Sequence, residues 1–539
     1  MAPTLSQKYL STRGAEYGLS FEDVVLQGLA KDGGLFIPEE IPSLPASWET
    51  EWADLSFEEL AFRLQSNFIS ESEIPSDDLR DIINRSYATF HHPQRTPLVD
   101  LDGKNNLHLL ELFHGQTRAF KDVALAYLGN LFEYFLVRKN EGKTGKDRLH
   151  LTVVGATSGD TGSAAISGLR GKKDCSVFIL FPEGRTSPIQ RLQMITVCDA
   201  NVHNLAVQGT FDNCQDTVKA LFADPKMNAE HHLAAVNSIN WARILAQITY
   251  YFYAYFQLKK SPGYNKEKLR IVVPSGNFGD ILAGWFAKQM GLPADKLVIA
   301  TNENDILDRF FRNDGHYTKK ALGAPADAED VKETHSPAMD ILVSSNFERL
   351  LWFLAYQTNN GSTAEERRGH ACENVSSWLN DLKSKGGFQV PSAVLEAAKA
   401  EFESERVSND ETISTIRETF SSCFPTNSGE SSPKSSKTGG YVLDPHTAVG
   451  IAASRRSIQR NPGVHHISLS TAHPAKFADA VDLALGGKEG YSFSEILPED
   501  FIGLEKRETR VTDVPAGTTW EGIRDLVIAE VDQELQGQR

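Results

Sequence analysis

The residue whose type and position most directly suggest chemistry is Lys121, in the segment AFKD at positions 119–122. An apolar helical pattern begins immediately after it, at residues 123–132. A lysine at such a helix start is commonly solvated, but burial would disfavour its ammonium form. Lowering a lysine pKa from about 10.4 to neutrality requires about 4–5 kcal/mol, at about 1.36 kcal/mol per unit. An amine shifted in this way forms Schiff bases with carbonyl groups, and the segment alone leaves both interpretations open.

Two glycine-rich turns could hold anionic groups. Each follows an apolar strand pattern and opens a helical pattern, at residues 155–162 (GATSGDTG) and 274–280 (PSGNFGD). Free backbone N–H groups and the helix dipole bind anions at such places. Neither turn has the G-x-G-x-x-G spacing of dinucleotide-binding folds, and the Gly-Lys-Thr at 142–144 has Val137 where a P-loop requires glycine. NAD and ATP are therefore disfavoured as ligands.

Alternating strand and helix patterns surround both turns. Short apolar runs predict buried strands at 149–154, 176–181, 269–273 and 464–470, each followed by a helical pattern. Strands that are apolar throughout, rather than in alternate positions, are typical of a parallel sheet covered on both faces. The sequence therefore predicts an α/β fold built on parallel strands.

Composition and pattern divide the chain into four parts. These parts are an accessory, mainly helical region (1–100), a catalytic α/β region (101–420) whose smaller subdomain spans about 122–236, a flexible loop rich in Ser, Gly and Pro (421–440), and a C-terminal part of the larger domain (441–539). In the first part, Ser20 is predicted to cap a helix, and a second helical pattern begins at Ser56. In the second, residues 303–343 are expected to be irregular and residues 362–420 mostly helical.

Overall composition limits the partners and the compartment. The chain has 539 residues, a formal charge of −16 and a pI near 5.5, a balance that disfavours nucleic acids and anionic membranes as partners. Its longest apolar run, residues 244–256, is too short to span a bilayer. The amino terminus lacks a signal or transit pattern. The five cysteines show no CxxC or Cys/His spacing, so we expect no metal site and a cytoplasmic location.

Several long blocks of the sequence resemble one enzyme family. With the Lys121 segment and the two glycine-rich turns, they are similar to the tryptophan synthase β-type (fold type II) pyridoxal-phosphate enzymes, and within that group to the threonine synthases. The similarity extends nearly from end to end. The matching blocks are YLSTRG, LAKDGGLFIPEEIP, LFHG-x-T-x-AFKDVAL, VVGATSGDTGSAA, VNSINWARILAQI, VVPSGNFGDILAG, SPAMDILVSSNFERL and STAHPAKF.

The resemblance implies a cofactor and its ligands. A fold type II enzyme with two α/β domains would use pyridoxal 5′-phosphate, bound as a Schiff base to Lys121, which would also act as general acid and base. Thr471 would hydrogen-bond the pyridine nitrogen of the cofactor. The cradle for its phosphate would consist of Gly276, Asn277, Phe278, Gly279 and Asp280.

The resemblance also implies a substrate site. Its candidate ligands are the residues of the family's carboxylate-binding turn and two residues outside it, namely Ser158, Gly159, Asp160, Thr161, Thr117 and Arg243. Related enzymes have asparagine at the position of Asp160, beside the phenolic oxygen of the cofactor, where an aspartate needs a shared proton. For Arg243 a structural role and a phosphate contact are equally consistent with the sequence, whereas for Lys476 a structural charge is favoured. Three histidines are expected to be structural, namely His114, His446 and His473.

One departure from the family's pattern precedes Lys121. The family usually has proline at position 116 and an apolar residue at position 118, where this chain has Gln116 and Arg118. Either the substrate pocket is altered or these side chains face outward. We expect Arg118 to face outward, outside the pocket.

The activity implied by the resemblance is the conversion of O-phospho-L-homoserine and water to L-threonine and phosphate, by γ-elimination and β-hydration. The sequence leaves two alternatives open. One is a phospholyase or serine/threonine dehydratase on the same scaffold, and the other is a non-catalytic binding protein of this fold. Because Lys121 and the phosphate cradle are retained, the binding protein is disfavoured. The chain is expected to be a monomer or a homodimer.

Overall fold

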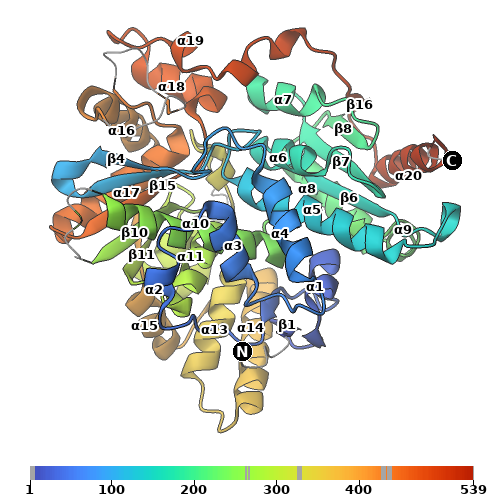
Figure 1. Cartoon of the computed structure of the whole chain (residues 1–539), viewed down its shortest axis with the longest axis horizontal. Coiled ribbons are helices and arrows are strands. Elements are labelled where there is room, and N and C mark those ends of the chain that lie inside the picture. The colour runs from blue at the N-terminus through green and yellow to red at the C-terminus, as the bar shows by residue number, and fades with distance from the viewer. Residues whose placement is uncertain are drawn as a thin grey trace.

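Two mainly parallel β-sheets, covered by helices, organise the chain (Figure 1). The computed structural model describes residues 7–261, 264, 268–324, 331–425, 432–433 and 440–537. Most of the loop predicted at 421–440 lies outside these residues. The α/β class and the parallel strands predicted from the sequence are confirmed.

The larger sheet has the strand order β14-β11-β10-β15-β5-β4, in which only β4 runs antiparallel to its neighbour. Strand β10 lies at its centre and is buried along its whole length, as its continuous apolar run predicts. The strands are β4 (Leu98–Asp102), β5 (Leu107–Glu111), β10 (Leu269–Pro274), β11 (Ala294–Thr301), β14 (Phe402–Arg406) and β15 (His465–Ser470).

The smaller sheet is parallel throughout and has the order β16-β8-β7-β6-β9. Its strands are β6 (Leu151–Ala156), β7 (Cys175–Pro182), β8 (Val202–Val207), β9 (Leu233–Ala234) and β16 (Thr512–Val514). The last strand pairs with β8, and the C-terminal helix α20 (Trp520–Gly537) packs beside this sheet (Figure 1). This differs from the expectation that all of 441–539 joins the larger domain, because a three-residue strand leaves little pattern in a sequence.

The N-terminal region combines helices with a small antiparallel sheet. Ser20 and Ser56 cap the helices that the sequence predicts, and each forms a capping box with the acidic residue three positions later. The sheet was not predicted, and its short strands surround the YLSTRG block. The elements are β1 (Tyr9–Ser11), β2 (Tyr17–Leu19), α1 (Phe21–Gln27), β3 (Phe36–Pro38), α2 (Trp48–Glu51), α3 (Phe57–Gln65) and α4 (Ser76–Tyr87).

The segments that the sequence describes as irregular or helical contain additional strands. Residues 303–343 include a helix and strand β12 (His316–Thr318), which pairs with β13 (Gly387–Gln389). Strand β14, with the charged sequence FESER, forms an edge of the larger sheet within the segment expected to be helical. Charged residues are common on edge strands, where they hide the strand signal.

The remaining helices cover the sheets and connect their strands. They are α5 (Lys121–Lys139), α6 (Asp160–Leu169), α7 (Pro188–Ile195), α8 (Phe211–Ala223), α9 (Pro225–His231), α10 (Trp241–Lys260), α11 (Gly279–Met290), α12 (Ile306–Arg312), α13 (Phe347–Thr358), α14 (Ala364–Lys385), α15 (Ser392–Glu401), α16 (Asn409–Ser422), α17 (Pro445–Arg460), α18 (Ala478–Leu485) and α19 (Phe493–Ile496).

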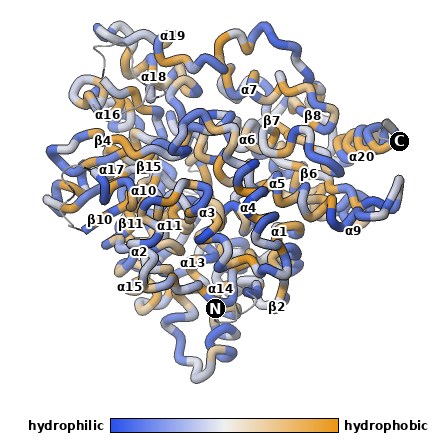
Figure 2. Tube along the Cα trace, viewed as in Figure 1, coloured by the Kyte–Doolittle hydropathy of each residue, from blue (hydrophilic) through white to orange (hydrophobic). Residues whose placement is uncertain are grey.

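One continuous apolar core joins the N-terminal region, the long helices and both sheets. Figure 2 shows hydrophobic residues recurring along the sheets and the helices against them, whereas hydrophilic residues dominate the outer loops. Helix α10 is buried over most of its length and carries the aromatic cluster of this core. Among the described helices, none combines the length and the apolarity that a membrane crossing needs.

Helices α5 and α6 cross in close contact at two glycines. A Cβ on Gly129 would overlap the carbonyl oxygen of Gly168, and a Cβ on Gly168 would overlap that of Leu125. Lys121 begins α5 and Asp160 begins α6. The glycine contact therefore fixes the separation of these two charged residues.

We expect Gly129→Ala to lower the free energy of unfolding by about 1–3 kcal/mol, because the added methyl group forces the two helices apart. Turnover should fall with it, because Lys121 and Asp160 move apart. Gly369→Ala is the matched control, since Gly369 lies within α14 with open space around its Cβ position. This control should be neutral or slightly stabilising. Denaturant unfolding of both variants makes the comparison, and equal effects would contradict the close-contact argument.

Candidate active site

The predicted site residues meet where strands of both sheets end. Thr471 follows β15, the 274–280 turn follows β10, and the 155–162 turn follows β6. The Lys121 segment reaches this place through two backbone contacts. Phe120 N donates to Thr471 O at 2.8 Å, and Ala119 forms an isolated bridge with Ala472. The carboxyl ends of parallel strands are the usual position of ligand sites in α/β folds.

Lys121 is largely buried, and its side chain is 11% exposed. Its Nζ lies 3.8 Å from Asp160 Oδ2 and 4.6 Å from the centre of the Phe120 ring. Burial lowers the pKa of Lys121, and Lys476 and Arg243 lower it further by charge repulsion, outweighing the opposite effect of Asp160 and Asp122. The buried, shifted amine expected of a nucleophilic lysine is therefore present.

Asp160 is the main anionic side chain of this site. Burial alone would raise its pKa, but the positive charges of Lys476 and Lys121 lower the pKa well below its ordinary value. Asp160 Oδ1 lies 2.9 Å from Lys476 Nζ and accepts a hydrogen bond from Gln190 Nε2 at 2.8 Å. The carboxylate is therefore held ionised.

The 155–162 turn presents free backbone amides beside Asp160. Thr157 Oγ1 accepts hydrogen bonds from the amides of Gly159 and Gly162, at 2.9 and 2.8 Å, and so fixes the loop. Gly159 has φ 144°, and a Cβ there would overlap Gln190. The amides of Ser158, Asp160 and Thr161 have no acceptor among the described residues. The loop can therefore bind a carboxylate.

The 274–280 turn also leaves its amides free. None of the amides of residues 276–279 donates to an acceptor in the described part of the chain. The carbonyl groups of the turn are held from behind, since Ser344 Oγ donates to Gly276 O at 2.7 Å and Asn346 Nδ2 donates to Asn277 O at 3.0 Å. Phe278 has φ 61° and packs its buried ring on Phe347. The turn is therefore a rigid concavity of N–H groups, suited to a phosphate.

Asp280 points away from this concavity. Its carboxylate accepts hydrogen bonds from the hydroxyls of Tyr250 and Tyr251, at 2.5 and 2.8 Å. Burial nevertheless raises the pKa of Asp280 to about 6. Both hydroxyls bind Oδ1, and Oδ2 of Asp280 has no hydrogen-bond partner among the described residues.

Thr471 offers a neutral hydroxyl at the end of β15. Its amide donates to Thr447 Oγ1 at 3.2 Å, which fixes the backbone. Its own hydroxyl forms no hydrogen bond with another described residue. This is the arrangement that a hydroxyl reserved for a ligand atom requires.

Before Lys121, Thr117 and Arg118 lie differently from the expectation, whereas Gln116 faces outward, as one of the two alternatives predicts. The Thr117 hydroxyl donates to Asp122 Oδ1 at 2.6 Å, so it supports the Lys121 segment rather than offering a group to a substrate. Gln116 is exposed and accepts from Ser167 Oγ at 2.6 Å. Arg118 does not face outward as expected, because it is buried and pairs with Asp500.

Arg243 is a buried guanidinium with no ion pair among the described residues. It donates to Val236 O at 2.8 Å, and its Nε atom has no partner. Burial lowers the pKa of Arg243 to about 10. Because Arg243 also lowers the pKa of Lys121, its charge acts on the same site.

The three histidines are held by protein groups. His114 pairs with Glu111 at 2.7 Å, and His446 Nε2 accepts from Ala338 N at 3.1 Å. His473 accepts from Ala475 N at 3.2 Å, and burial lowers its pKa well below the ordinary value. Structural roles are therefore consistent with each position.

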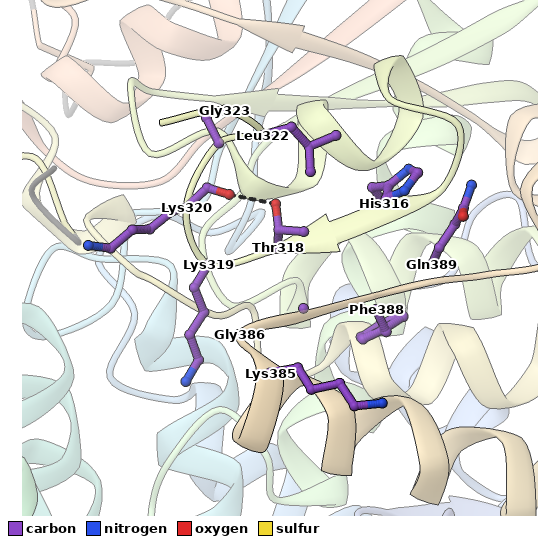
Figure 3. A pocket seen from close by; sticks show the side chains of 12 residues that line it. His316, Thr318, Lys319, Lys320, Leu322, Gly323, Lys385, Gly386, Phe388 and Gln389 are labelled. Atoms are coloured by element: carbon purple, nitrogen blue, oxygen red, sulfur yellow. Dashed lines mark hydrogen bonds between the residues drawn. The ribbon is translucent and has the colours of Figure 1, made fainter. Parts of the chain in front are cut away.

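A cavity of about 580 Å³ opens elsewhere, beside β12 and β13. Its lining contains none of the site residues predicted above. Figure 3 shows that the ammonium ends of Lys319, Lys320 and Lys385 point in different directions rather than converging. These lysines therefore do not form an anion site together.

Three family models match consecutive parts of the chain. "Threonine synthase N terminus" matches residues 8–87, "Pyridoxal-phosphate dependent enzyme" matches 89–352, and "Threonine synthase, C-terminal" matches 447–527. The middle match contains Lys121 and both glycine-rich turns. The chain is therefore a pyridoxal-phosphate-dependent enzyme with the fold type II architecture, as the sequence predicts.

Individual relatives narrow this class. The threonine synthase of Schizosaccharomyces pombe is 55% identical over 507 residues, covering 93% of this chain and 94% of the relative. The crystal structure of threonine synthase from yeast has a TM-score of 0.88 at 51% identity, covering 99% of both chains. The PLP-bound threonine synthase from Brucella melitensis has a TM-score of 0.82 at 38% identity, covering 97% of this chain and 99% of that one. The chain belongs to the threonine synthase family.

The residues present fit the pyridoxal-phosphate cofactor of this class. The free amides of residues 276–279 match a phosphate, and a Cβ on Gly276 would lie 3.1 Å from Ala338 O, so the turn accepts no larger residue easily. The buried Lys121 amine matches the aldehyde, and the unpartnered Thr471 hydroxyl matches a ring nitrogen.

The sequence did not identify two residues that bind Asp160. Lys476 was considered a structural charge and is indeed ion-paired, but with an aspartate of the site itself. Gln190 was not considered, because nothing in the sequence near it suggests a contact with residue 160. The only available signal was that Lys476 stands in the STAHPAKF block that begins one residue before Thr471.

We expect Lys121→Ala to abolish the borohydride-reducible bond between protein and cofactor, together with turnover. Removing a buried amine leaves no unpaired partner, so the free energy of unfolding of the cofactor-free chain should change by less than about 1 kcal/mol. Mass spectrometry of the reduced protein locates the bond, with the exposed Lys506 changed to alanine as control. A reduced adduct on another lysine of the variant that still turns over would contradict the assignment.

Asp280 links stability to pH. The raised carboxyl pKa, about 6 against 3.8 in the unfolded chain, contributes stability that is complete below pH 3.8 and is lost as pH rises through about 6. The loss amounts to about 3 kcal/mol, at about 1.36 kcal/mol per unit. Asp280→Asn lacks this dependence, so its stability relative to the parent should increase between pH 4 and 7. Unfolding of both proteins across this range is the measurement, and parallel profiles would contradict the argument.

Proposed function

We propose that this chain converts O-phospho-L-homoserine and water to L-threonine and inorganic phosphate. The observation that carries the substrate assignment is Arg243, a buried cation with no ion pair among the described residues, whose charge acts on Lys121. A buried and unpaired charge is costly, and an anionic ligand group compensates for it. Membership of the threonine synthase family supports a phosphorylated amino acid as the source of that anion.

Each anionic end of the substrate is assigned a protein group that can bind an anion. The α-carboxylate is assigned to the free amides of Ser158, Asp160 and Thr161, and the side-chain phosphate to Arg243. The cofactor phosphate is assigned to residues 276–280 through their backbone, and the cofactor ring nitrogen to the Thr471 hydroxyl. Two phosphate groups thus bind at separate places, one built from amides and one from a guanidinium.

The cofactor, when bound, supplies an electron sink for negative charge at the substrate carbons. Lys121 Nζ takes the proton from the substrate α-carbon and returns protons later in the reaction. Its lowered pKa favours the uncharged amine that this step needs. Asp160 Oδ2, 3.8 Å away, is the anion that faces the proton-bearing nitrogen.

The assay that tests this proposal follows several products at once. Purified protein and O-phospho-L-homoserine should yield L-threonine and phosphate in equal amounts. A phospholyase would yield 2-oxobutanoate, ammonia and phosphate instead. A serine/threonine dehydratase would yield 2-oxo acids from unphosphorylated amino acids, and a binding protein would yield no product. Any of these three results would overturn the proposal.

Arg243→Met should raise the KM for O-phospho-L-homoserine by ten-fold or more, which corresponds to about 1.4 kcal/mol of lost binding. Arg118→Met is the matched control, because Arg118 is also a buried arginine but is paired with Asp500. Its KM should stay within a factor of about three, whatever its effect on stability. Similar KM values for both variants would remove Arg243 from the phosphate site.

We further propose a cytoplasmic location and a monomeric or homodimeric state. Sedimentation velocity of the purified chain tests the assembly, and a larger oligomer would contradict it.

A further inference from the structure

Asp160 lies between the amines of Lys121 and Lys476, of which only Lys121 has a part in the proposed reaction. Its Oδ1 atom lies 2.9 Å from Lys476 Nζ, and its Oδ2 atom lies 3.8 Å from Lys121 Nζ. Gln190 Nε2 donates to Oδ1 as well, at 2.8 Å. The nearer lysine is therefore not the nucleophile, and the carboxylate is turned by two donors on one oxygen so that the other oxygen faces Lys121.

Lys476 is held in place from a second direction. Its Nζ donates to Thr117 O at 2.6 Å, and Thr117 in turn binds the carboxylate of Asp122 through its amide and hydroxyl, at 2.8 and 2.6 Å. Asp122 directly follows Lys121. Lys476 follows β15 of the larger sheet, whereas Asp160 begins a helix after β6 of the smaller sheet. One ammonium thus connects the Lys121 segment with both sheets.

Lys121 is the amine that reacts, whereas Lys476 is held in an ion pair with Asp160. An amine bonded to a carbonyl carbon no longer has its own ammonium charge to pair with Asp160. Lys476, which is 1% exposed, remains as a fixed cationic partner in a place that water does not reach. Without it, Asp160 would be a buried carboxylate whose remaining ion pair among the described residues is with Lys121. Such a carboxylate would turn toward that amine and hold it protonated.

We infer that Lys476 is a positioning residue, which holds the Asp160 carboxylate by Oδ1 and thereby keeps the Lys121 amine uncharged and available for reaction. The other charged groups that face this pair are Arg243, Asp122 and Asp280, which act on Lys121, and His446, which acts on Asp160. The inference does not depend on the identity of the substrate, because it concerns the amine itself. A result that overturns the proposed substrate would therefore leave this inference unchanged.

The test measures the Lys121 amine directly in the full-length chain freed of cofactor, with folding verified by circular dichroism. Reductive methylation with formaldehyde and cyanoborohydride reports the uncharged amine, and mass spectrometry of the Lys121 peptide gives its rate against pH. Lys476→Met should raise the midpoint of this pH profile of Lys121 methylation by about one pH unit or more. The reason is that the charge repulsion is lost and Asp160 turns to Lys121. Lys506→Met, at an exposed lysine, should leave the midpoint unchanged.

Asp160→Asn distinguishes positioning from simple charge repulsion. Alone it should lower the midpoint, since it removes the anion facing Lys121. Combined with Lys476→Met it removes both members of the Asp160–Lys476 ion pair, so neither is left buried without the other. If Lys476 positions Asp160, then Lys476→Met raises the midpoint by at least about 0.5 pH unit more in the parent chain than in the Asp160→Asn background. Equal rises would show repulsion alone and overturn the inference, and so would no rise at all.

A second readout uses the rate at which visible absorbance appears when pyridoxal phosphate is added to the same proteins. This rate should be lower for Lys476→Met than for the parent at pH 7, and the two should converge at higher pH, where both amines are uncharged. Lys476→Gln replaces Lys476→Met in every comparison if the latter does not fold. A rate that is lower by the same factor at every pH would indicate a merely structural defect and overturn the inference.

Discussion

The structure depends on burying one amine, that of Lys121, in a site whose proposed ligands are mostly anions. Lys121 must be buried to lose its proton, but the same site has to accept phosphate and carboxylate groups, which favour a protonated amine. The chain meets both demands by placing further cations nearby. Lys476 and Arg243 lower the pKa of Lys121 by charge repulsion. A site with excess positive charge then binds its anions without relying on the catalytic ammonium.

The fold meets this constraint by distributing the charges over separate elements. Asp160 begins α6 beside the smaller sheet, and Lys476 follows β15 of the larger sheet. Lys121 begins α5, directly after the segment in which Ala119 bridges to Ala472. The close contact of α5 and α6 at Gly129 and Gly168 leaves little freedom in the Lys121–Asp160 separation. The ion pair between Asp160 and Lys476 therefore joins an element of the smaller sheet to one of the larger sheet. Packing and electrostatics are therefore coupled in this site.

The sequence predicted what is local and missed what depends on distant partners. The two glycine turns, their strands and the helices after them follow from residues adjacent in the chain, and so does the place of Lys121 at the start of a helix. The burial of Arg118 does not follow from adjacent residues, because its partner Asp500 lies in a C-terminal segment with no recognisable pattern. The same holds for Gln190, whose amide reaches Asp160 only in the folded chain. The sequence does not predict strand β14, because its charged residues are equally typical of an exposed helix and of an edge strand.

The N-terminal region supports the cofactor site through one buried side chain. Arg349 donates from Nε to Phe36 O in β3 at 2.8 Å, and from Nη2 to Ile239 O, before α10, at 2.5 Å. Its third contact is Asn346, which holds Asn277 O of the cradle at 3.0 Å. Burial lowers the pKa of Arg349 to about 9, so the guanidinium is tolerated only while these acceptors stay in place. The buried guanidinium of Arg349 therefore links the N-terminal region to the cradle, because breaking its hydrogen bonds would leave a buried charge without acceptors. The N-terminal region is accordingly continuous with the main apolar core.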